Sequence, residues 1–433
     1  MSLSVVRGRT VTCLADPFQT DGALSYESDG VIVMSDGRIL NIGPAADVLP
    51  TVPAGIPVAH YPDCLISPGF IDTHVHYTQT GITGSYGAEL LDWLNQYAYP
   101  AELRYSDRTH AEEMARAFCD QLVSNGTTTA LVFCAVFPES VDALFEEAAR
   151  RNLRLIAGKT LMDRNAPAAL LDTAQSAYDQ SKALIARWHD RGRAHYAITP
   201  RFAPTSSPEQ LELAGALWAE HPDVFVHSHL SENAAECAWV RELFPDNAHY
   251  LDVYDRFGLT GRRAVFAHGV HLSEDELMLC HHTGTALAHC PTSNFFLGSG
   301  VFNLANAKAP ARPVHVGLGT DIGAGTSFSI LATLNEAYKA ARLSGGTLDG
   351  VRGWYLATLG AAKALGLDAH IGSLEVGKDA DVIVIDPAAT PLLKLRTERC
   401  ESIEELLFVL MTLGDDRVIA DTYLAGVRTS ARD

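Results

Sequence analysis

The sequence predicts an α/β fold, a (β/α)₈ TIM-like barrel joined to a small β-sandwich domain that both ends of the chain build. Two observations predict it. In the middle of the chain, eight short apolar segments alternate with longer segments of helical pattern, which is the order of repeated strand-helix units. Both ends contain short strand-like runs separated by Gly and Asp turn signals. We therefore place the small domain in residues 1–66 plus 371–433 and the barrel in residues 67–370.

The terminal segments justify the small domain. Their strand-like runs are short and punctuated by Asp-Gly or Gly, as in hairpins, and they lie at residues 6–16, 29–43, 58–69, 372–387 and 416–429. Because the two ends share this pattern, we expect them to pair in one unit.

The central segments justify the barrel. The eight strand candidates are residues 65–76, 127–135, 153–161, 195–204, 224–232, 263–271, 285–291 and 314–321. Helical patterns between them begin near Asp, Ser or Glu and often end near Gly, as in residues 108–126, 139–152, 170–192 and 273–284. A doubly wound open sheet is the alternative, but no Gly-x-Gly-x-x-Gly follows an early strand.

Size and charge restrict the class of protein. The chain has 433 residues, of which 47% are hydrophobic, so disordered, collagen-like and small disulfide-bonded proteins are excluded. The formal net charge is −19 and the sequence contains no basic block. Nucleic acids and anionic membranes attract stripes of Lys and Arg, so we expect neither as a partner. A small substrate without strong negative charge fits better.

The cysteines and the N-terminus predict a cytoplasmic protein. The eight cysteines are scattered, form no Cys-x-x-Cys pair, and are interpreted as reduced thiols. Charged Arg7, Arg9 and Asp16 interrupt the apolar run that a signal peptide needs. No apolar run of 18 residues occurs in the sequence, so we expect no membrane span.

The first chemical signal is His74 and His76, at the end of the first barrel strand. Residues two apart on a strand point to the same side, so both imidazoles face one point. Two convergent imidazoles suit a borderline divalent metal such as zinc. Alone, the pair is a weak signal.

Later strands repeat the signal at equivalent places. His229, His268 and Asp321 each lie where a predicted strand meets its loop, and these junctions form one face of a barrel. Several imidazoles and one carboxylate, without thiolates, are what an open catalytic metal site needs. The pattern therefore predicts a metal site.

Glu232 follows His229 by three residues. A carboxylate beside the metal can move a proton between water and a leaving nitrogen. The alternative makes Glu232 the first-turn acid of a helix that begins at Asn233. We favour catalysis because the metal cluster is adjacent.

Other candidates keep more than one interpretation. His227 shares the inward side of its strand with His229, where it either supports a metal ligand or packs in a layer of the barrel interior. His289 ends the seventh strand and either touches substrate or packs in the core. Lys159 ends the third strand, where it either bridges two metals as a carbamate or makes structural contacts. The long segment Tyr77–Asp107, with Trp93, is expected to act as a lid, a subunit contact or ordinary packing.

Several motifs resemble one family. Residues Pro68–His76 (PGFIDTHVH) resemble the opening signature of the amidohydrolase superfamily, metal-dependent hydrolases on a distorted barrel with a small β-sandwich domain. The longer stretches that resemble guanine deaminases within it are KTLMDRNAP (159–167), ITPRFAPTSS (198–207), SHLSEN (228–233), HCPTSN (289–294) and GTDIGAG (319–325). The resemblance covers essentially the whole chain.

The resemblance implies an activity and roles for residues. The activity is hydrolysis of guanine to xanthine and ammonia in purine catabolism, by a homodimer with one Zn²⁺ per chain and Fe²⁺ as the alternative. The implied metal-site residues are His74, His76, His229, His268 and Asp321. Glu232, Asp321 and His268 would carry the chemistry, with Glu232 shuttling protons. The implied substrate-binding residues are Gln79, Arg201, Phe202, His229 and Glu232.

Two departures and three rival classes qualify the implied substrate. Ser206 stands where Cys is more familiar, and Thr78–Gly81 replaces a stretch with Pro and Asp. Neither departure changes an implied metal ligand, so both bear on substrate preference rather than on the metal chemistry. The rivals are a related deaminase acting on another aminopurine, pterin or triazine, a two-metal hydrolase that uses Lys159, and a noncatalytic binding protein.

Overall fold

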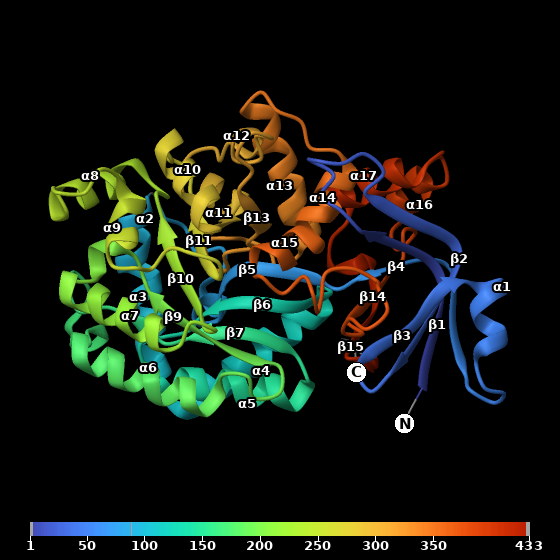
Figure 1. The fold of residues 1–433 in the computed structure, drawn as a ribbon, viewed down its shortest axis with the longest axis horizontal. Helices are drawn as coiled ribbons and strands as arrows, with labels where there is room; N and C mark the ends of the chain where they lie inside the picture. Colours follow the sequence, from blue (N-terminus) through green and yellow to red (C-terminus); the bar gives the residue numbers. More distant parts are fainter. Residues whose placement is uncertain (1–2, 88, 430–433) are drawn as a thin grey trace.

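The structure, a computed structural model, describes residues 3–87 and 89–429. Eight parallel strands form a nearly closed barrel in the order β13-β12-β11-β10-β9-β7-β6-β5 (Figure 1). The strands are β5 (Phe70–His76), β6 (Thr127–Phe133), β7 (Arg154–Gly158), β9 (Ala194–Pro200), β10 (Phe225–Leu230), β11 (Ala264–His268), β12 (Ala286–His289) and β13 (His315–Leu318). This confirms the predicted (β/α)₈ barrel.

The barrel closes next to the predicted chemistry. The backbone N–H of Asp321 donates to the carbonyl of His74 over 2.9 Å, and that of His76 donates to Ile322 over 3.0 Å. The segment that follows β13 therefore lies along the end of β5. This places Asp321 beside the two histidines, although they are far apart in the sequence.

Burial on both faces explains why the strands appear as apolar runs. Every residue of β5, β6 and β10 is buried. Side chains such as Ile71, Leu131 and Val265 fill the interior, while helices cover the outside. A parallel sheet buried on both faces needs apolar residues at nearly every position.

The outer helices begin at the predicted signals. They are α4 (Arg108–Ser124), α5 (Pro138–Arg151), α6 (Ala174–Trp188), α7 (Pro208–Glu220), α8 (Ala234–Leu243), α9 (Tyr250–Arg256), α10 (Glu274–Thr283), α13 (Ile330–Leu343), α14 (Gly350–Ala357) and α15 (Leu359–Ala364). Asp107 caps α4 by accepting from Thr109, and Ser273 forms a capping box with Glu276 at the start of α10. Helix α10 ends at Gly284, whose φ of 77° is left-handed.

Shorter elements occupy the loops. They are α1 (Ala45–Val48), η1 (Leu49–Thr51), η2 (Tyr77–Ile82), α2 (Leu90–Trp93), η3 (Leu94–Ala98), α3 (Tyr99–Leu103), η4 (Arg104–Ser106), β8 (Thr160–Leu161), η5 (Ala168–Leu170), η6 (Ala203–Thr205), α11 (Pro291–Phe296), α12 (Leu304–Ala307) and η7 (Asp416–Val418). Five of them lie in the predicted segment Tyr77–Asp107, namely η2, α2, η3, α3 and η4.

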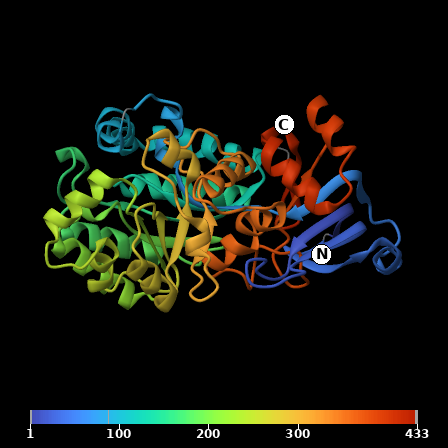
Figure 2. The ribbon, with the colours of Figure 1, turned by 90° about the horizontal axis from the view of Figure 1, so that it is seen from above.

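Both ends of the chain build the second sheet. Its order is β16-β15-β14-β4-β1-β2-β3, and Figures 1 and 2 show its blue and red parts side by side at one end of the molecule. The strands are β1 (Leu3–Cys13), β2 (Leu24–Ser35), β3 (Arg38–Pro44), β4 (Val58–Pro68), β14 (Val382–Ile385), β15 (Ile419–Leu424) and β16 (Val427–Thr429). Strand β14 pairs antiparallel with β4, with Val384 opposite Ile66.

The C-terminal segment also contains two helices that the sequence analysis did not predict, α16 (Pro391–Thr397) and α17 (Ile403–Leu413). Helix α17 packs closely against α14 of the barrel. A Cβ atom on Gly350 would lie 2.6 Å from the backbone nitrogen of Phe408, so glycine permits this approach. The pattern after residue 371 predicted short strands, which β14, β15 and β16 confirm. It did not reveal the two helices, because they lie between the two strand-like runs. In the described part of the chain, no helix is both long and apolar enough to cross a membrane.

Candidate active site

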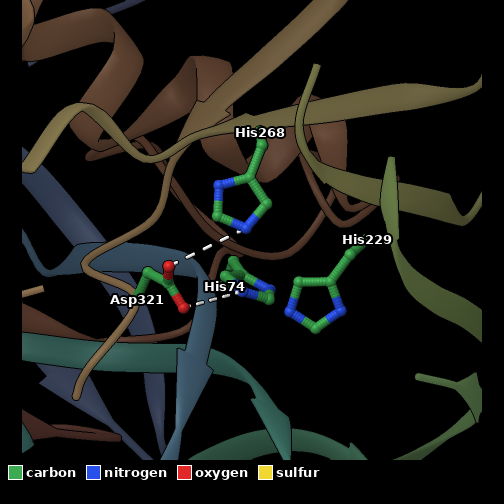
Figure 3. Close-up of side chains that lie close together, drawn as sticks. All are labelled: His74, His229, His268 and Asp321. Atoms are coloured by element: carbon green, nitrogen blue, oxygen red, sulfur yellow. Dashed lines mark ion pairs between the residues drawn. The ribbon is translucent and has the colours of Figure 1, made fainter. Parts of the chain in front are cut away.

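Five residues that the sequence analysis predicted as metal ligands meet at the carboxyl end of the barrel. His74 and His76 lie on β5, His229 is near the end of β10, His268 is the last residue of β11, and Asp321 follows β13. All five are buried. Potential ligand atoms of four of them, His74, His229, His268 and Asp321, lie within 4.8 Å of one another (Figure 3).

The fifth, His76, joins the same cluster. Its Nε2 lies 3.2 Å from Nε2 of His229 and 3.3 Å from Oδ1 of Asp321. The same carboxylate oxygen is 3.0 Å from Nε2 of His74, and Oδ2 is 3.8 Å from Nε2 of His268. Asp321 therefore faces three imidazoles at once.

Hydrogen bonds on the far side of two rings orient nitrogen lone pairs into the cluster. Nδ1 of His229 donates to the carbonyl of Arg201 over 2.6 Å, and Nδ1 of His268 donates to Oδ1 of Asn294 over 2.9 Å. A neutral imidazole that donates through Nδ1 carries a lone pair on Nε2. Both Nε2 atoms are thus presented as ligands rather than as donors.

The cluster has the composition and the orphaned atoms of a divalent metal site. Among residues 3–87 and 89–429, Nε2 of His74 has no hydrogen bond of acceptable geometry, although Asp321 is 3.0 Å away. Burial lowers the pKa of His76 to about 3 and holds the pKa of His229 well below its usual range. Imidazole lone pairs gathered this closely suit a divalent cation. Imidazole nitrogens and one carboxylate, without thiolate, fit zinc or iron.

Asp321 is held as an anion in this cluster. Burial by itself would raise its pKa, but the neighbouring His74 and His76 hold the pKa well below its usual range. The backbone is strained here, because Asp321 has a φ of 51° and His268 a φ of 75°, values that non-glycine residues rarely adopt. Glycine at 319 allows the approach, since a Cβ there would lie 2.8 Å from Cβ of His74.

Glu232 lies beside the cluster rather than in the helix that follows. Its Oε2 is 3.4 Å from Nε2 of His268, and its Oε1 accepts a hydrogen bond from Ser299 over 3.3 Å. Helix α8 begins after the N-cap Asn233, and Glu236 is its first-turn acid. The alternative that made Glu232 the first-turn acid is therefore wrong.

Burial, reinforced by the charge of Asp321, raises the pKa of Glu232 to about 8. The carboxyl group is thus able to carry a proton near neutral pH. Glu236 holds the backbone of Glu232 in place, because its Oε2 accepts a hydrogen bond from the backbone N–H of Glu232 over 2.9 Å.

A cavity opens onto the cluster. His76, His229, Glu232, His268 and Asp321 line its polar floor, together with Gln79 and Arg201. The apolar residues that line it are Leu90, Trp93, Leu94, Phe202, Leu297 and Ala324. All the predicted substrate-binding residues thus reach one pocket, and the segment Tyr77–Asp107 covers part of it.

Arg201 lines the cavity and also pairs with a carboxylate. Its Nη1 donates to both oxygens of Glu102, over 2.8 and 2.7 Å. Both residues are buried. Glu102 could not be predicted from the sequence, because no spacing pattern relates a lone Glu on the short helix α3 to a strand end far along the chain.

The remaining candidates have structural surroundings. Nε2 of His227 shares a hydrogen bond of 2.8 Å with Nδ1 of His74, so His227 supports that ring. His289 is buried against the ring of Phe302, with centroids 4.7 Å apart, and does not belong to the cavity lining. Lys159 is buried between β7 and β8 and forms an ion pair with Asp172.

The profile of the Amidohydrolase family matches residues 65–429. The chain belongs to this family. Over 428 residues this amidohydrolase is 52% identical to the guanine deaminase of Escherichia coli K12, an alignment that covers 98% of this chain and 97% of that protein.

Solved structures agree with the sequence comparison. The E. coli guanine deaminase structure aligns with a TM-score of 0.97 at 51% identity, covering 99% of this amidohydrolase and 100% of that chain. The guanine deaminase from C. acetobutylicum, crystallised with guanine bound in the active site, aligns with a TM-score of 0.88 at 29% identity and covers 99% and 100%. This amidohydrolase therefore belongs to the guanine deaminase branch of the family.

Proposed function

We propose that this amidohydrolase hydrolyses the C2 amine of guanine, giving xanthine and ammonia. The observation that carries the proposal is one buried cavity that joins a His/Asp metal-type cluster, the proton-carrying Glu232 and the donors of Arg201 and Gln79. The full-length identity to guanine deaminases supports the same substrate. The activity is that of a hydrolase acting on the C–N bond of a cyclic amidine.

His74, His76, His229, His268 and Asp321 would hold one Zn²⁺, with Fe²⁺ as the alternative. When bound, such an ion lowers the pKa of water to about 7 and so supplies a nucleophile at neutral pH. Support for a single ion comes from the donor set, which completes one site, and from Lys159, whose amine is already paired with Asp172.

The proton steps fall to two carboxyl groups. Asp321, ionised and facing the cluster, accepts a proton from the attacking water. Glu232, with its raised pKa, donates to the ring nitrogen beside C2, then takes the proton of the new C2 hydroxyl and passes it to the departing amine. The proton that Asp321 accepted then returns to Glu232, which restores both carboxyl groups. Nε2 of His268 lies 3.4 Å from Oε2 of Glu232, where it would either coordinate the ion or accept a hydrogen bond from the attacking water.

The purine ring would lie between apolar walls, with its polar edge against Arg201 and Gln79. A guanidinium has donors only, so it suits the O6 and N7 acceptors of guanine. Phe202 offers a ring face for stacking. We also infer a homodimer in the cytoplasm; the family resemblance supports the first inference, and eight free thiols support the second.

Ammonia release from a substrate panel tests the proposal. The panel contains guanine, adenine, a pterin and a triazine. We expect guanine to exceed adenine in kcat/KM by about 10⁴-fold, because adenine presents an amine where Arg201 needs an acceptor. Arg201→Ala should lose most guanine activity. Comparable rates on adenine, or full guanine activity in Arg201→Ala, would overturn the assignment.

A further inference from the structure

Glu102 is a buried carboxylate with two partners that face the cavity. Besides the two hydrogen bonds from Nη1 of Arg201, its Oε1 accepts from Nε2 of Gln79 over 3.2 Å. It lies on α3, in the segment that covers the barrel mouth, and its exposed fraction is 0%. The three side chains come from separate elements and meet only here.

Glu102 fixes the direction of the Gln79 amide. Oε1 of Gln79 accepts from the backbone N–H of Gly323 over 3.2 Å, while Nε2 donates to Glu102. A flipped amide would set its oxygen against the carboxylate and its NH₂ group against an N–H donor. The amide nitrogen of Gln79 and Nη1 of Arg201 therefore converge on the same carboxylate, and both side chains line the cavity.

Glu102 also compensates the charge of Arg201. Arg201 is 2% exposed, and Tyr99 lies over its guanidinium with the ring centroid 5.2 Å from Cζ. A buried guanidinium without an anion beside it would attract an anionic ligand strongly. The charge of Asp321 also acts on Arg201, but Asp321 already faces the histidines of the cluster.

We propose that Glu102 is a positioning and specificity-determining residue, which holds Arg201 and Gln79 toward an acceptor edge of the purine. Because Glu102 also cancels the charge of the arginine, the pocket prefers a neutral aminopurine to an anionic oxopurine. This inference rests on the proposed function for its substrate. The product xanthine is more acidic than guanine, because its second oxo group stabilises the anion. The ion pair thus favours product release.

Glu102→Gln tests the proposal, because the amide keeps the shape and removes the charge. We expect KM for guanine to rise about tenfold or more, with a smaller change in kcat, because positioning at the ring edge is weakened. Calorimetric binding of xanthine, at a pH where xanthine is ionised, should become at least tenfold tighter. Binding of hypoxanthine, which is neutral at that pH, should not tighten.

The matched control is Glu112→Gln, which removes a carboxylate that pairs with Arg108 on α4, outside the cavity. It should leave both kinetics and xanthine binding unchanged. In an Arg201→Met background, Glu102→Gln should no longer tighten xanthine binding, because the uncompensated charge is gone.

A purely structural role predicts a different pattern. Equal weakening of xanthine and hypoxanthine binding in Glu102→Gln, or no change in either, overturns the proposal. Glu102→Asp serves if the glutamine variant fails to fold, since it keeps the charge and should keep xanthine affinity low while KM rises. Absence of guanine turnover in the parent protein would refute the proposed function alone, because the two binding titrations still report on the ion pair.

Discussion

Glu232 combines burial, a raised pKa and a place beside the cluster. Ser299 and His268 face its two oxygens, and Glu236 holds its backbone. The fold of α8 does not depend on the charge of Glu232, because Asn233 and Glu236 cap this helix. The side chain is therefore available for proton transfer.

Glu232→Gln should lower kcat by about 10²- to 10⁴-fold while metal content and guanine binding stay near normal. The amide occupies the same space but cannot deliver a proton. Steady-state kinetics with elemental analysis measures both quantities. Glu209→Gln, which changes an exposed first-turn acid of α7, is the matched control and should leave kcat unaltered. Near-normal turnover in Glu232→Gln would remove the proton shuttle from the mechanism.

At the scale of elements, the third barrel strand is interrupted at Lys159. Residues 153–161 were expected to form one strand, but the structure has β7 and β8 with Lys159 between them. The amine pairs with Asp172, and burial lowers the pKa of Lys159 and raises that of Asp172. The ion pair of Lys159 joins the interrupted strand to the following loop. A lysine paired in this way is not free to form the carbamate that a two-metal hydrolase needs.

Lys159→Met should cost about 3 kcal/mol of stability, because Asp172 loses its partner. Thermal unfolding should show a lowered midpoint, and Lys159→Met/Asp172→Leu should recover part of it. The intact mass of the parent should contain no added CO₂ on Lys159. A carbamate in that mass, or loss of bound metal in Lys159→Met without loss of stability, would restore the two-metal interpretation.

At the scale of the whole molecule, ion pairs join the barrel to the terminal sheet. Arg154 at the start of β7 pairs with Asp379, and Arg193 before β9 pairs with Asp381. Arg38 of β3 reaches Asp379 over 2.6 Å. These residues lie at the amino ends of the barrel strands, opposite the cavity, where contacts serve stability rather than chemistry.

Asp379→Asn should therefore lower the thermal midpoint without changing KM for guanine. The buried arginine Arg154 loses its anion, which costs about 3 kcal/mol or more. Hydrogen exchange should increase around β14 and leave β5 and β10 protected. Asp36→Asn, at an exposed turn near the same face, is the control. A large rise in KM with Asp379→Asn would mean that the two ends of the barrel are coupled.

The sequence predicted those parts of the fold and site that periodic patterns encode. Alternation of apolar and helical segments located all eight barrel strands, and strand ends located His74, His229 and Asp321. Polar contacts between distant loops have no periodic signal, so Glu102 beside Arg201 and Asn294 behind His268 were not assigned roles. Helices α16 and α17 were missed because residues 391–413 lie between two strand-like runs.

The central claim is that one metal ion in the His/Asp cluster enables hydrolysis of guanine. The most direct measurement removes metal with a chelator, adds Zn²⁺ back in steps, and follows ammonia release from guanine. The stripped protein should have little activity, and its rate should rise linearly with added Zn²⁺ and saturate at one ion per chain. Full activity without metal, or saturation only at two ions per chain, would contradict it.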